Sequence, residues 1–202
     1  MKRVTSKDGT SIAYQRGGSG PAVILVGGGL VDPATGRAGR SENEPLATEL
    51  SEHFTVYNYD RRGRADSRDT PPYALERELE DIEALIAEAG GSAHLYGVSS
   101  GGAEETIAGA RNSPMWPGLE GVAHTLAYDA VCLGNGNPPT ARLTTITQPT
   151  LVATGGGDDF FEQAADAIVA SMPRAERLII EGQTHVVDPK ALAPVLERFF
   201  GQ

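Results

Sequence analysis

Five short apolar runs, separated by helical patterns, constrain the fold of this 202-residue chain more than any other feature. Two of them, "AVILV" at 22–26 and "FTVYNY" at 54–59, are continuous rather than alternating, as in strands buried on both faces. The others are "AHLYGVS" at 93–99, "PTLVATGGG" at 149–157 and "RLIIEGQ" at 177–183. These runs predict the strands of a parallel sheet.

Apolar residues at helical spacing lie between the predicted strands. Leu75, Leu79, Ile82 and Ile86 form one such set, and similar sets lie at 161–172 and 192–199. Asp188 and Pro189 predict the cap and first turn of the last helix. A shorter helix is expected within 42–54. The alternation predicts an α/β three-layer sandwich, a mostly parallel open sheet with helices on both faces.

The remaining organisation is simple. Asp8-Gly9 predicts the turn of an N-terminal hairpin, and Leu133–Leu143 reads as a loop. The length fits one domain over residues 1–202 with a sizeable core.

Charge and composition exclude several function classes. The net charge of −10, from 17 basic and 27 acidic residues, argues against nucleic acid or an anionic membrane as a partner. The single cysteine, Cys132, allows no intrachain disulfide. We find no signal peptide and no apolar run long enough to cross a bilayer, so we expect a soluble, cytoplasmic protein.

The segment Gly97–Gly101 reads G-x-S-x-G and lies between a predicted strand and a segment that can be helical. A strand that turns sharply into a helix strains the residue at the bend, whose neighbours two positions away must be small. Gly97 and Gly101 satisfy this around Ser99, whereas Val98 fails it for Ser100. The pattern therefore indicates a nucleophilic Ser99, although a glycine-rich turn with a solvent-facing serine would carry the same letters.

A serine nucleophile needs a base, and four histidines are available. His53, His94 and His124 fall in or beside predicted helices and a core strand, where structural roles are expected. His185 follows the last strand, which places it on a loop at the carboxyl edge of the sheet together with Ser99.

The acid that orients the base is expected after the preceding strand. Asp158 and Asp159 both follow its glycines, and an aspartate here can also cap the next helix. We assign Asp158 to catalysis and Asp159 to capping, with the reverse assignment left open. His185 and Asp158 lack a third residue at metal-ligand spacing, so no metal is expected.

Two backbone amides could stabilise an oxyanion. The amide of Ser100 lies at a predicted helix start, where N–H groups are unsatisfied and negative charge is favoured. The second would come from the glycines of "VGGGLVDP" at 26–33, with Gly28 first and Gly29 next. A dinucleotide-binding loop is not indicated there, because the G-x-G-x-x-G spacing is missing.

These segments resemble the α/β-hydrolase superfamily over nearly the whole chain. The likeness rests on "VILVGGG", "YDRRGRADS", "GVSSGG", "PTLVATGGGDD" and "GQTHVVDP", in the family's order. The order Ser99, Asp158, His185 also matches that family's triad order. In "DRRGRADS", Arg62, Arg64 and Asp66 are expected to form a structural charge network.

The resemblance implies a serine hydrolase that cleaves a carboxylic ester or related small carbonyl substrate through an acyl-enzyme on Ser99. It implies no cofactor. Lyase or perhydrolase chemistry on the same triad stays open, as do substrate identity and oligomeric state. The alternative from another class is a non-catalytic ligand-binding or interaction protein on the same scaffold.

One part of the family pattern is missing from the sequence. No strand pattern appears near Asn112–Pro114, so we expect a reduced cap, with residues 112–145 as a cap or lid remnant. If the strand is absent, the strand after Pro149 should pair with the strand at 93–99, and the pocket should be open. Candidate pocket residues are Gly29, Leu30, Trp116, His124 and Tyr128, although simple helix packing also explains the apolar residues after Trp116.

Overall fold

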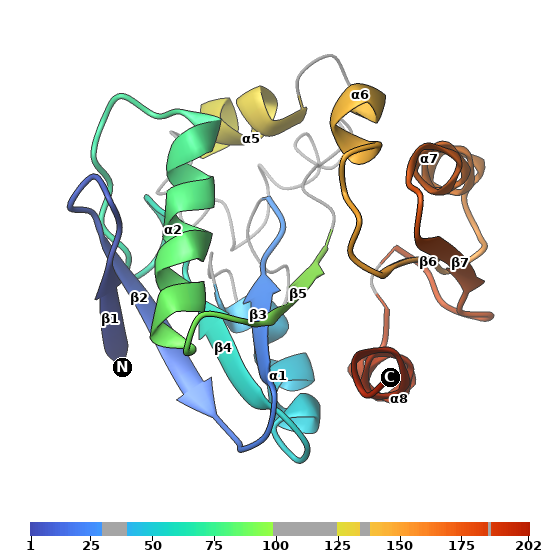
Figure 1. Ribbon diagram of the computed structural model, residues 1–202, viewed down its shortest axis with the longest axis horizontal. Helices are drawn as coiled ribbons and strands as arrows, with labels where there is room; N and C mark the ends of the chain where they lie inside the picture. Colours follow the sequence, from blue (N-terminus) through green and yellow to red (C-terminus); the bar gives the residue numbers. More distant parts are fainter. Residues whose placement is uncertain (30–39, 99–124, 134–137, 186) are drawn as a thin grey trace, which may run out of the picture. The chain divides into compact units, whose positions relative to one another are not determined.

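The computed structural model describes residues 1–29, 40–98, 125–133, 138–185 and 187–202. The chain divides into two compact units, Met1–Leu133 and Gly134–Gln202 (Figure 1). The expectations of one domain over 1–202 with a cap remnant at 112–145 stay predictions, as does the pairing of the Pro149 strand with the strand at 93–99.

The first unit contains a five-stranded sheet in the order β1-β2-β4-β3-β5. The predicted hairpin is confirmed, with β1 (Lys2–Thr5) antiparallel to β2 (Ser11–Gly17). Gly9 in its turn has φ +88°, a conformation that glycine adopts without steric cost. β2 is also antiparallel to β4, whereas β3 is parallel to both β4 and β5, so the sheet is mixed.

Two of the three predicted core strands of this unit form as continuous buried segments, and the third, at 93–99, does not. β3 (Ala22–Val26) has a buried centre, and β4 (Thr55–Tyr59) is buried at every position. β5 (His94–Gly97) is the edge of this sheet, and half of the Leu95 side chain is exposed.

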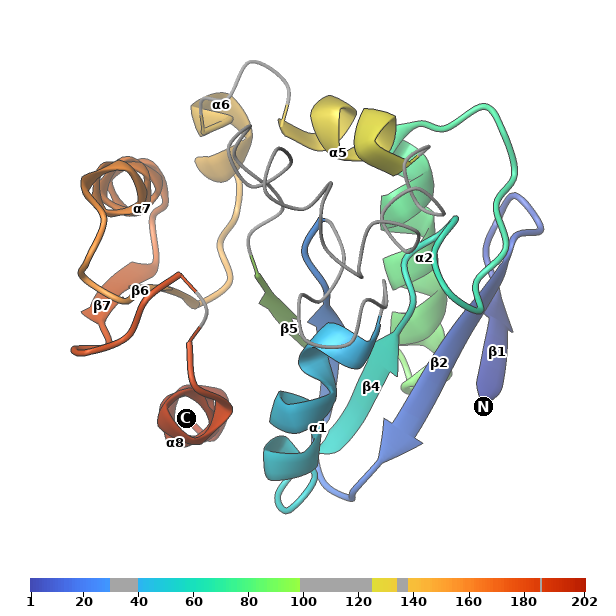
Figure 2. The same ribbon diagram turned by 180° about the vertical axis from the view of Figure 1, so that it is seen from behind.

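Helices cover both faces of this sheet, as predicted. Figures 1 and 2 show α2 (Leu75–Glu88) on one face and α1 (Glu44–Leu50) on the opposite face over β4. A 3-10 turn, η1 (Arg40–Asn43), leads into α1. The last helix of this unit is α5 (Leu126–Leu133).

Helix α2 packs Ile82 and Ile86 against the core, as its apolar spacing predicts, but Leu79 departs from that pattern. Leu79 is 52% exposed, whereas Glu78, Asp81 and Leu85 are buried. The reason is electrostatic: Glu78 accepts hydrogen bonds from Arg61, and Asp81 accepts them from Arg62. Paired in this way, two carboxylates can be buried on the helix beside its apolar residues.

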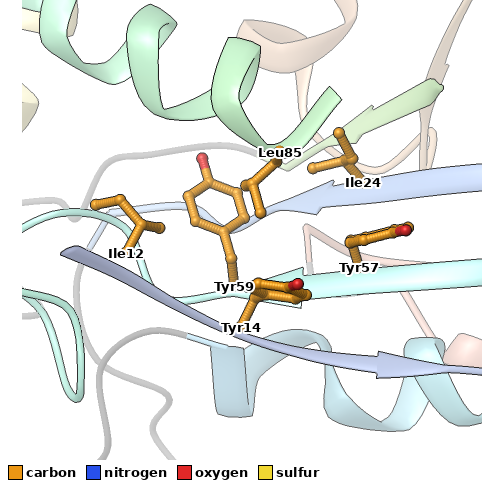
Figure 3. Packing of buried hydrophobic residues seen from close by; sticks show 6 residues of the cluster. All are labelled: Ile12, Tyr14, Ile24, Tyr57, Tyr59 and Leu85. Carbon is orange, nitrogen blue, oxygen red and sulfur yellow. The ribbon is translucent and has the colours of Figure 1, made fainter. Parts of the chain in front are cut away.

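The core under α2 consists mainly of aromatic and branched side chains. Figure 3 shows that these come from β2, β3, β4 and α2: Ile12, Tyr14, Ile24, Tyr57, Tyr59 and Leu85. The rings of Tyr14 and Tyr57 stack at 5.7 Å, and the Tyr14 hydroxyl reaches solvent-side Glu88, to which it donates at 2.7 Å. This core fixes β3 and β4, whose ends carry the candidate site.

The second unit contains a parallel pair of strands, β6 (Thr150–Thr154) and β7 (Ala175–Ile179). They are followed by α7 (Asp159–Ser171) and α8 (Pro189–Phe200), both close to their predicted ranges. Asp188 caps α8 by accepting from the Lys190 amide at 2.9 Å, as predicted.

The prediction of a loop over Leu133–Leu143 is wrong for its last four residues. Residues Thr140–Leu143 form a short helix, α6, that begins after Pro139. Two consecutive prolines precede it, and their restricted φ favours the first turn of a helix.

Candidate active site

The carboxyl ends of β3 and β5 bring two predicted site segments to one edge of the first unit. The two strands run parallel with Val26 opposite Gly97, and the Val98 amide donates to the Val26 carbonyl at 3.4 Å. Gly97 and Val98 therefore lie beside Val26, where the glycines at 27–29 leave the sheet. Ser99 and Ser100 lie outside the described residues.

Gly28, the predicted oxyanion donor, is buried and held on both sides. Its N–H donates to Oε2 of Glu42 at 3.1 Å, and its carbonyl accepts from Nη1 of Arg61 at 3.2 Å. Gly29 follows it, half-buried, and Leu30 lies outside the described residues. In this structure the Gly28 amide thus already donates to an anionic group.

Glu42 lies in η1, accepts a hydrogen bond from Gly28 and interacts electrostatically with Tyr96 of β5. Burial and the charge of Glu42 raise the pKa of Tyr96, on β5, to about 12. A carboxylate therefore lies beside the Gly28 amide, a feature that the sequence analysis missed. Glu42 fell within the predicted short helix, and no local pattern distinguishes it.

Arg61 follows β4 and connects the glycines to two helices. Its guanidinium donates to both carboxylate oxygens of Glu78, at 3.2 and 3.0 Å, and to Oδ1 of Asp129 at 3.1 Å. Burial lowers the pKa of Arg61, but the carboxylates of Glu78 and Asp129 raise it by more than burial lowers it. The pKa of Arg61 is therefore above its ordinary value. Arg61 is thus a permanently charged donor against the Gly28 carbonyl.

Arg62, Arg64 and Asp66 of "DRRGRADS" are each ion-paired, as predicted, but each has its own partners and none of the printed pairs joins them to one another. Arg62 pairs with Asp8 and Asp81, Arg64 donates to Asp129 at 2.7 Å, and Asp66 pairs with Arg40 at 3.0 Å. Asp60, fully buried at the end of β4, also pairs with Arg40.

Tyr128, one of the predicted pocket residues, lies on α5 and packs against the loop that precedes α2. Its ring stacks on Tyr73 with centroids 4.0 Å apart, and its hydroxyl donates to Asp69 at 2.5 Å. That hydrogen bond, with burial, raises the pKa of Tyr128 to about 12. These contacts are those of helix packing. Trp116 and His124 lie outside the described residues, so a pocket that includes them stays a prediction.

In the second unit, the loops that carry Asp158 and His185 lie against each other. A side chain at Gly155, after β6, would approach the Gln183 carbonyl, after β7, to 2.5 Å. His185 is exposed and its ring stacks on Phe161 of α7, with centroids 4.4 Å apart. Asp158 and His185 both lie within the described residues, and no hydrogen bond joins their side chains in this structure.

The capping assignment is corrected by the structure. Asp158, not Asp159, is the N-cap of α7, and its Oδ1 accepts from the Phe160 amide at 2.8 Å. Asp159 is the first helical residue, one position too late for its side chain to cap the helix. The catalytic assignment of Asp158 stays a prediction, with Oδ1 engaged and Oδ2 without a hydrogen bond within the described part of the chain.

Two further observations concern possible ligands. A cavity of about 400 Å³ lies between α1 and the strands β1, β2 and β4, lined by residues such as Lys2, Gln15 and Thr48, and the glycines at 27–29 do not line it. No group of three or more metal-ligating side chains occurs in the described ranges. No helix of the described residues is long and apolar enough to cross a membrane.

Comparison with known proteins supplies the family. Residues 22–133 match the Alpha/beta hydrolase family. An alpha/beta hydrolase from Sphaerobacter thermophilus DSM 20745 superimposes with a TM-score of 0.87 and 37% identity, over 98% of this chain and 100% of that one. A thermophilic esterase from Thermogutta terrifontis superimposes with a TM-score of 0.77 at 18% identity, over 99% and 97% of the two chains.

A curated sequence relative is the uncharacterized hydrolase YraK of Bacillus subtilis (strain 168), 35% identical over 97 residues. The match spans 46% of this chain and 33% of the relative's length. Together the similarities confirm the predicted fold, in a shortened form.

Proposed function

Because the chain belongs to the alpha/beta hydrolase family, we propose that it is a serine hydrolase acting on a carboxylic ester or related small carbonyl substrate. The proposed triad is Ser99, Asp158 and His185, with the amides of Gly28 and Ser100 as oxyanion donors. Within the family, hydrolysis is the shared chemistry of the named relatives; the ester substrate and the triad are our proposal.

One observation carries this proposal. β5 ends at Gly97 directly beside Val26, so the first two residues of G-x-S-x-G, Gly97 and Val98, lie next to the start of the glycines at 27–29. A nucleophile and an amide donor must lie within about 3 Å of one reacting carbonyl, which requires neighbouring loops at one sheet edge. The register of β3 and β5 supplies this neighbourhood.

The proposed reaction proceeds in two halves. His185 accepts the Ser99 hydroxyl proton while the oxygen attacks the carbonyl carbon, and the Gly28 and Ser100 amides stabilise the oxyanion. The intermediate collapses, and His185 returns the proton to the departing alcohol. Water, deprotonated by His185, then attacks the acyl-enzyme, and the acid and Ser99 are released.

Two local contacts must be accommodated in this scheme. The Gly28 amide donates to Glu42, so the substrate oxyanion takes the place of the Glu42 carboxylate. Asp158 uses Oδ1 as a helix cap, which leaves Oδ2 to accept from Nδ1 of His185. One carboxylate can serve both roles because each oxygen has its own lone pairs.

The test is covalent labelling with a fluorophosphonate, followed by intact mass. We expect wild type and Ser100→Ala to gain one adduct and Ser99→Ala to gain none. Ser100 is a matched control, because its proposed role uses the backbone amide and not the hydroxyl. Labelling that persists in Ser99→Ala contradicts the proposal.

The second candidate, a non-catalytic ligand-binding protein on the same fold, is favoured by one contact. The Glu42 carboxylate on the Gly28 amide blocks a donor that hydrolysis would need. This candidate predicts no adduct in wild type at any pH and no turnover of chromogenic esters of increasing acyl length. Turnover in that panel excludes it and reports the preferred acyl size.

A further inference from the structure

We propose that Arg61 is a positioning residue that sets the orientation of the oxyanion glycines at 27–29. The inference rests on the proposed function for its catalytic consequence. Its structural basis is the hydrogen bond from Nη1 of Arg61 to the Gly28 carbonyl at 3.2 Å.

The Gly28 carbonyl belongs to the peptide group that joins Gly28 to Gly29. In a planar trans peptide the carbonyl and the following N–H point in opposite directions, so a bond that fixes this carbonyl also fixes the Gly29 N–H. Three consecutive glycines would otherwise sample many backbone conformations. Arg61 therefore restricts the part of the chain where a donor must be preorganised.

Arg61 can restrict the glycine backbone because carboxylates of two helices hold its own guanidinium in place. Glu78 of α2 binds it through two hydrogen bonds, and Asp129 of α5 accepts a third at 3.1 Å. The guanidinium is buried, and its planar donors reach the helix carboxylates and the Gly28 carbonyl at once. A lysine at this position cannot keep the two-point contact with Glu78 and also reach Gly28.

The same contacts link the oxyanion glycines to α5. Oδ1 of Asp129 accepts from Arg61 and from Arg64, at 3.1 and 2.7 Å, so two buried cations hold one carboxylate of that helix. Arg61 thus connects α5 with the peptide group that joins Gly28 to Gly29.

The neighbouring Arg62 offers a matched control. It is also buried, binds two carboxylates, Asp8 and Asp81, and donates to the Arg77 carbonyl. Of these contacts none involves the glycines at 27–29. Substitution of Arg62 should therefore cost stability through the same loss of buried ion pairs, without disturbing the oxyanion donors.

The experiment compares Arg61→Lys with Arg62→Lys. Active sites are counted by fluorophosphonate titration, so that kcat refers to folded enzyme. We expect Arg61→Lys to lower kcat about tenfold or more with KM changed less than about twofold, because donor orientation matters in the transition state. The affinity of Arg61→Lys for a boronic acid, which binds a nucleophilic serine as a tetrahedral adduct resembling the oxyanion intermediate, should fall in the same ratio.

Arg62→Lys should have a lower thermal midpoint than wild type but the same kcat per active site. Equal kcat losses in the two variants would overturn the proposal.

A second readout does not depend on catalysis. The amide ¹H–¹⁵N resonances of Gly28 and Gly29 should shift in Arg61→Lys and stay in place in Arg62→Lys. Unchanged glycine resonances in Arg61→Lys overturn the positioning role even if hydrolysis is intact. If fluorophosphonate does not label wild type but the glycine resonances still shift in Arg61→Lys, the positioning role is supported while the hydrolase assignment fails. The failure of one proposal can therefore be distinguished from the failure of the other.

Discussion

Asp158 caps α7 with one carboxylate oxygen, and the proposed triad needs the other. Asparagine caps helices about as well as aspartate, so Asp158→Asn should leave the thermal midpoint nearly unchanged. Its amide cannot stabilise a protonated His185 as a carboxylate does, and we expect kcat to fall on the order of 10³-fold. Ester hydrolysis and thermal unfolding of the same preparation measure both effects.

Asp159 is the control for that substitution. It is exposed, follows Asp158 directly and makes no cap, so Asp159→Asn should retain activity within about twofold. The opposite ranking, with Asp159→Asn inactive and Asp158→Asn active, would assign the triad acid to Asp159.

Glu42 competes with the substrate for the Gly28 amide in our scheme. Glu42→Gln replaces a charged acceptor by a neutral one of the same size, and the difference between such hydrogen bonds is about 1 kcal/mol. We therefore expect kcat/KM to rise about fivefold. Esterase assays across substrate concentration measure the change.

Glu44→Gln serves as the comparison for Glu42→Gln, since Glu44 is exposed in the first turn of α1 and loses the same charge. If both variants behave like wild type, Glu42 does not obstruct the oxyanion donor, and Gly29 becomes the preferred donor in place of Gly28.

At the scale of elements, Asp8 and Asp81 tie the N-terminal hairpin to α2 through Arg62. Burial raises the pKa of Asp8, but hydrogen bonds from Arg62 and from the Thr10 amide lower it more, to about 2 from an ordinary 3.8. A lowered folded-state pKa contributes stability above pH 3.8, and that contribution is lost as the pH falls toward 2. We expect this loss to be about 1–2 kcal/mol.

Urea unfolding of wild type and Asp8→Asn at several pH values isolates this contribution from other carboxylates. The variant should be less stable than wild type at pH 6, and the gap should narrow as the pH falls from about 4 to about 2. A gap that stays constant over this range would show that Asp8 is not linked to acid stability.

The sequence predicted the strands and most helices because their signals are local. Continuous apolar runs gave β3 and β4, and Asp188-Pro189 gave the start of α8. The burial of two acidic residues on α2 could not be predicted in the same way. Glu78 and Asp81 are buried only because Arg61 and Arg62 meet them, and neither arginine belongs to the helix.

The candidate site shows the same division. Chain order and strand ends placed Gly28 beside the segment after Gly97, and loop positions placed Asp158 near the loop of His185. The contacts from Glu42 and Arg61 to Gly28 join residues 14 and 33 positions apart in the chain. Such long-range hydrogen bonds leave no periodicity, so only the folded structure reveals them.

At the scale of the whole molecule, the chain has a net charge of −10, and among the described residues the buried charged side chains nearly cancel one another. Arg61, Arg62 and Arg64 are buried and each is paired with a carboxylate, so these cations give little positive potential to solvent. A negative field concentrates cationic substrates near the surface and repels anionic ones. Substrate charge should therefore affect kcat/KM in a salt-dependent way.

Acetylthiocholine and its neutral isostere, 3,3-dimethylbutyl thioacetate, have the same size and the same scissile bond, and they differ in charge. At low ionic strength we expect kcat/KM for the cationic ester to exceed that for the neutral ester by about threefold. Added salt shortens the Debye length from about 30 Å to about 3 Å and screens the long-range attraction. The ratio should then fall to the value set by short-range contacts between substrate and site. Stopped-time thiol release at several salt concentrations gives the ratio directly. A ratio independent of salt would mean that the net charge has no part in substrate capture, because long-range attraction cannot survive screening unchanged.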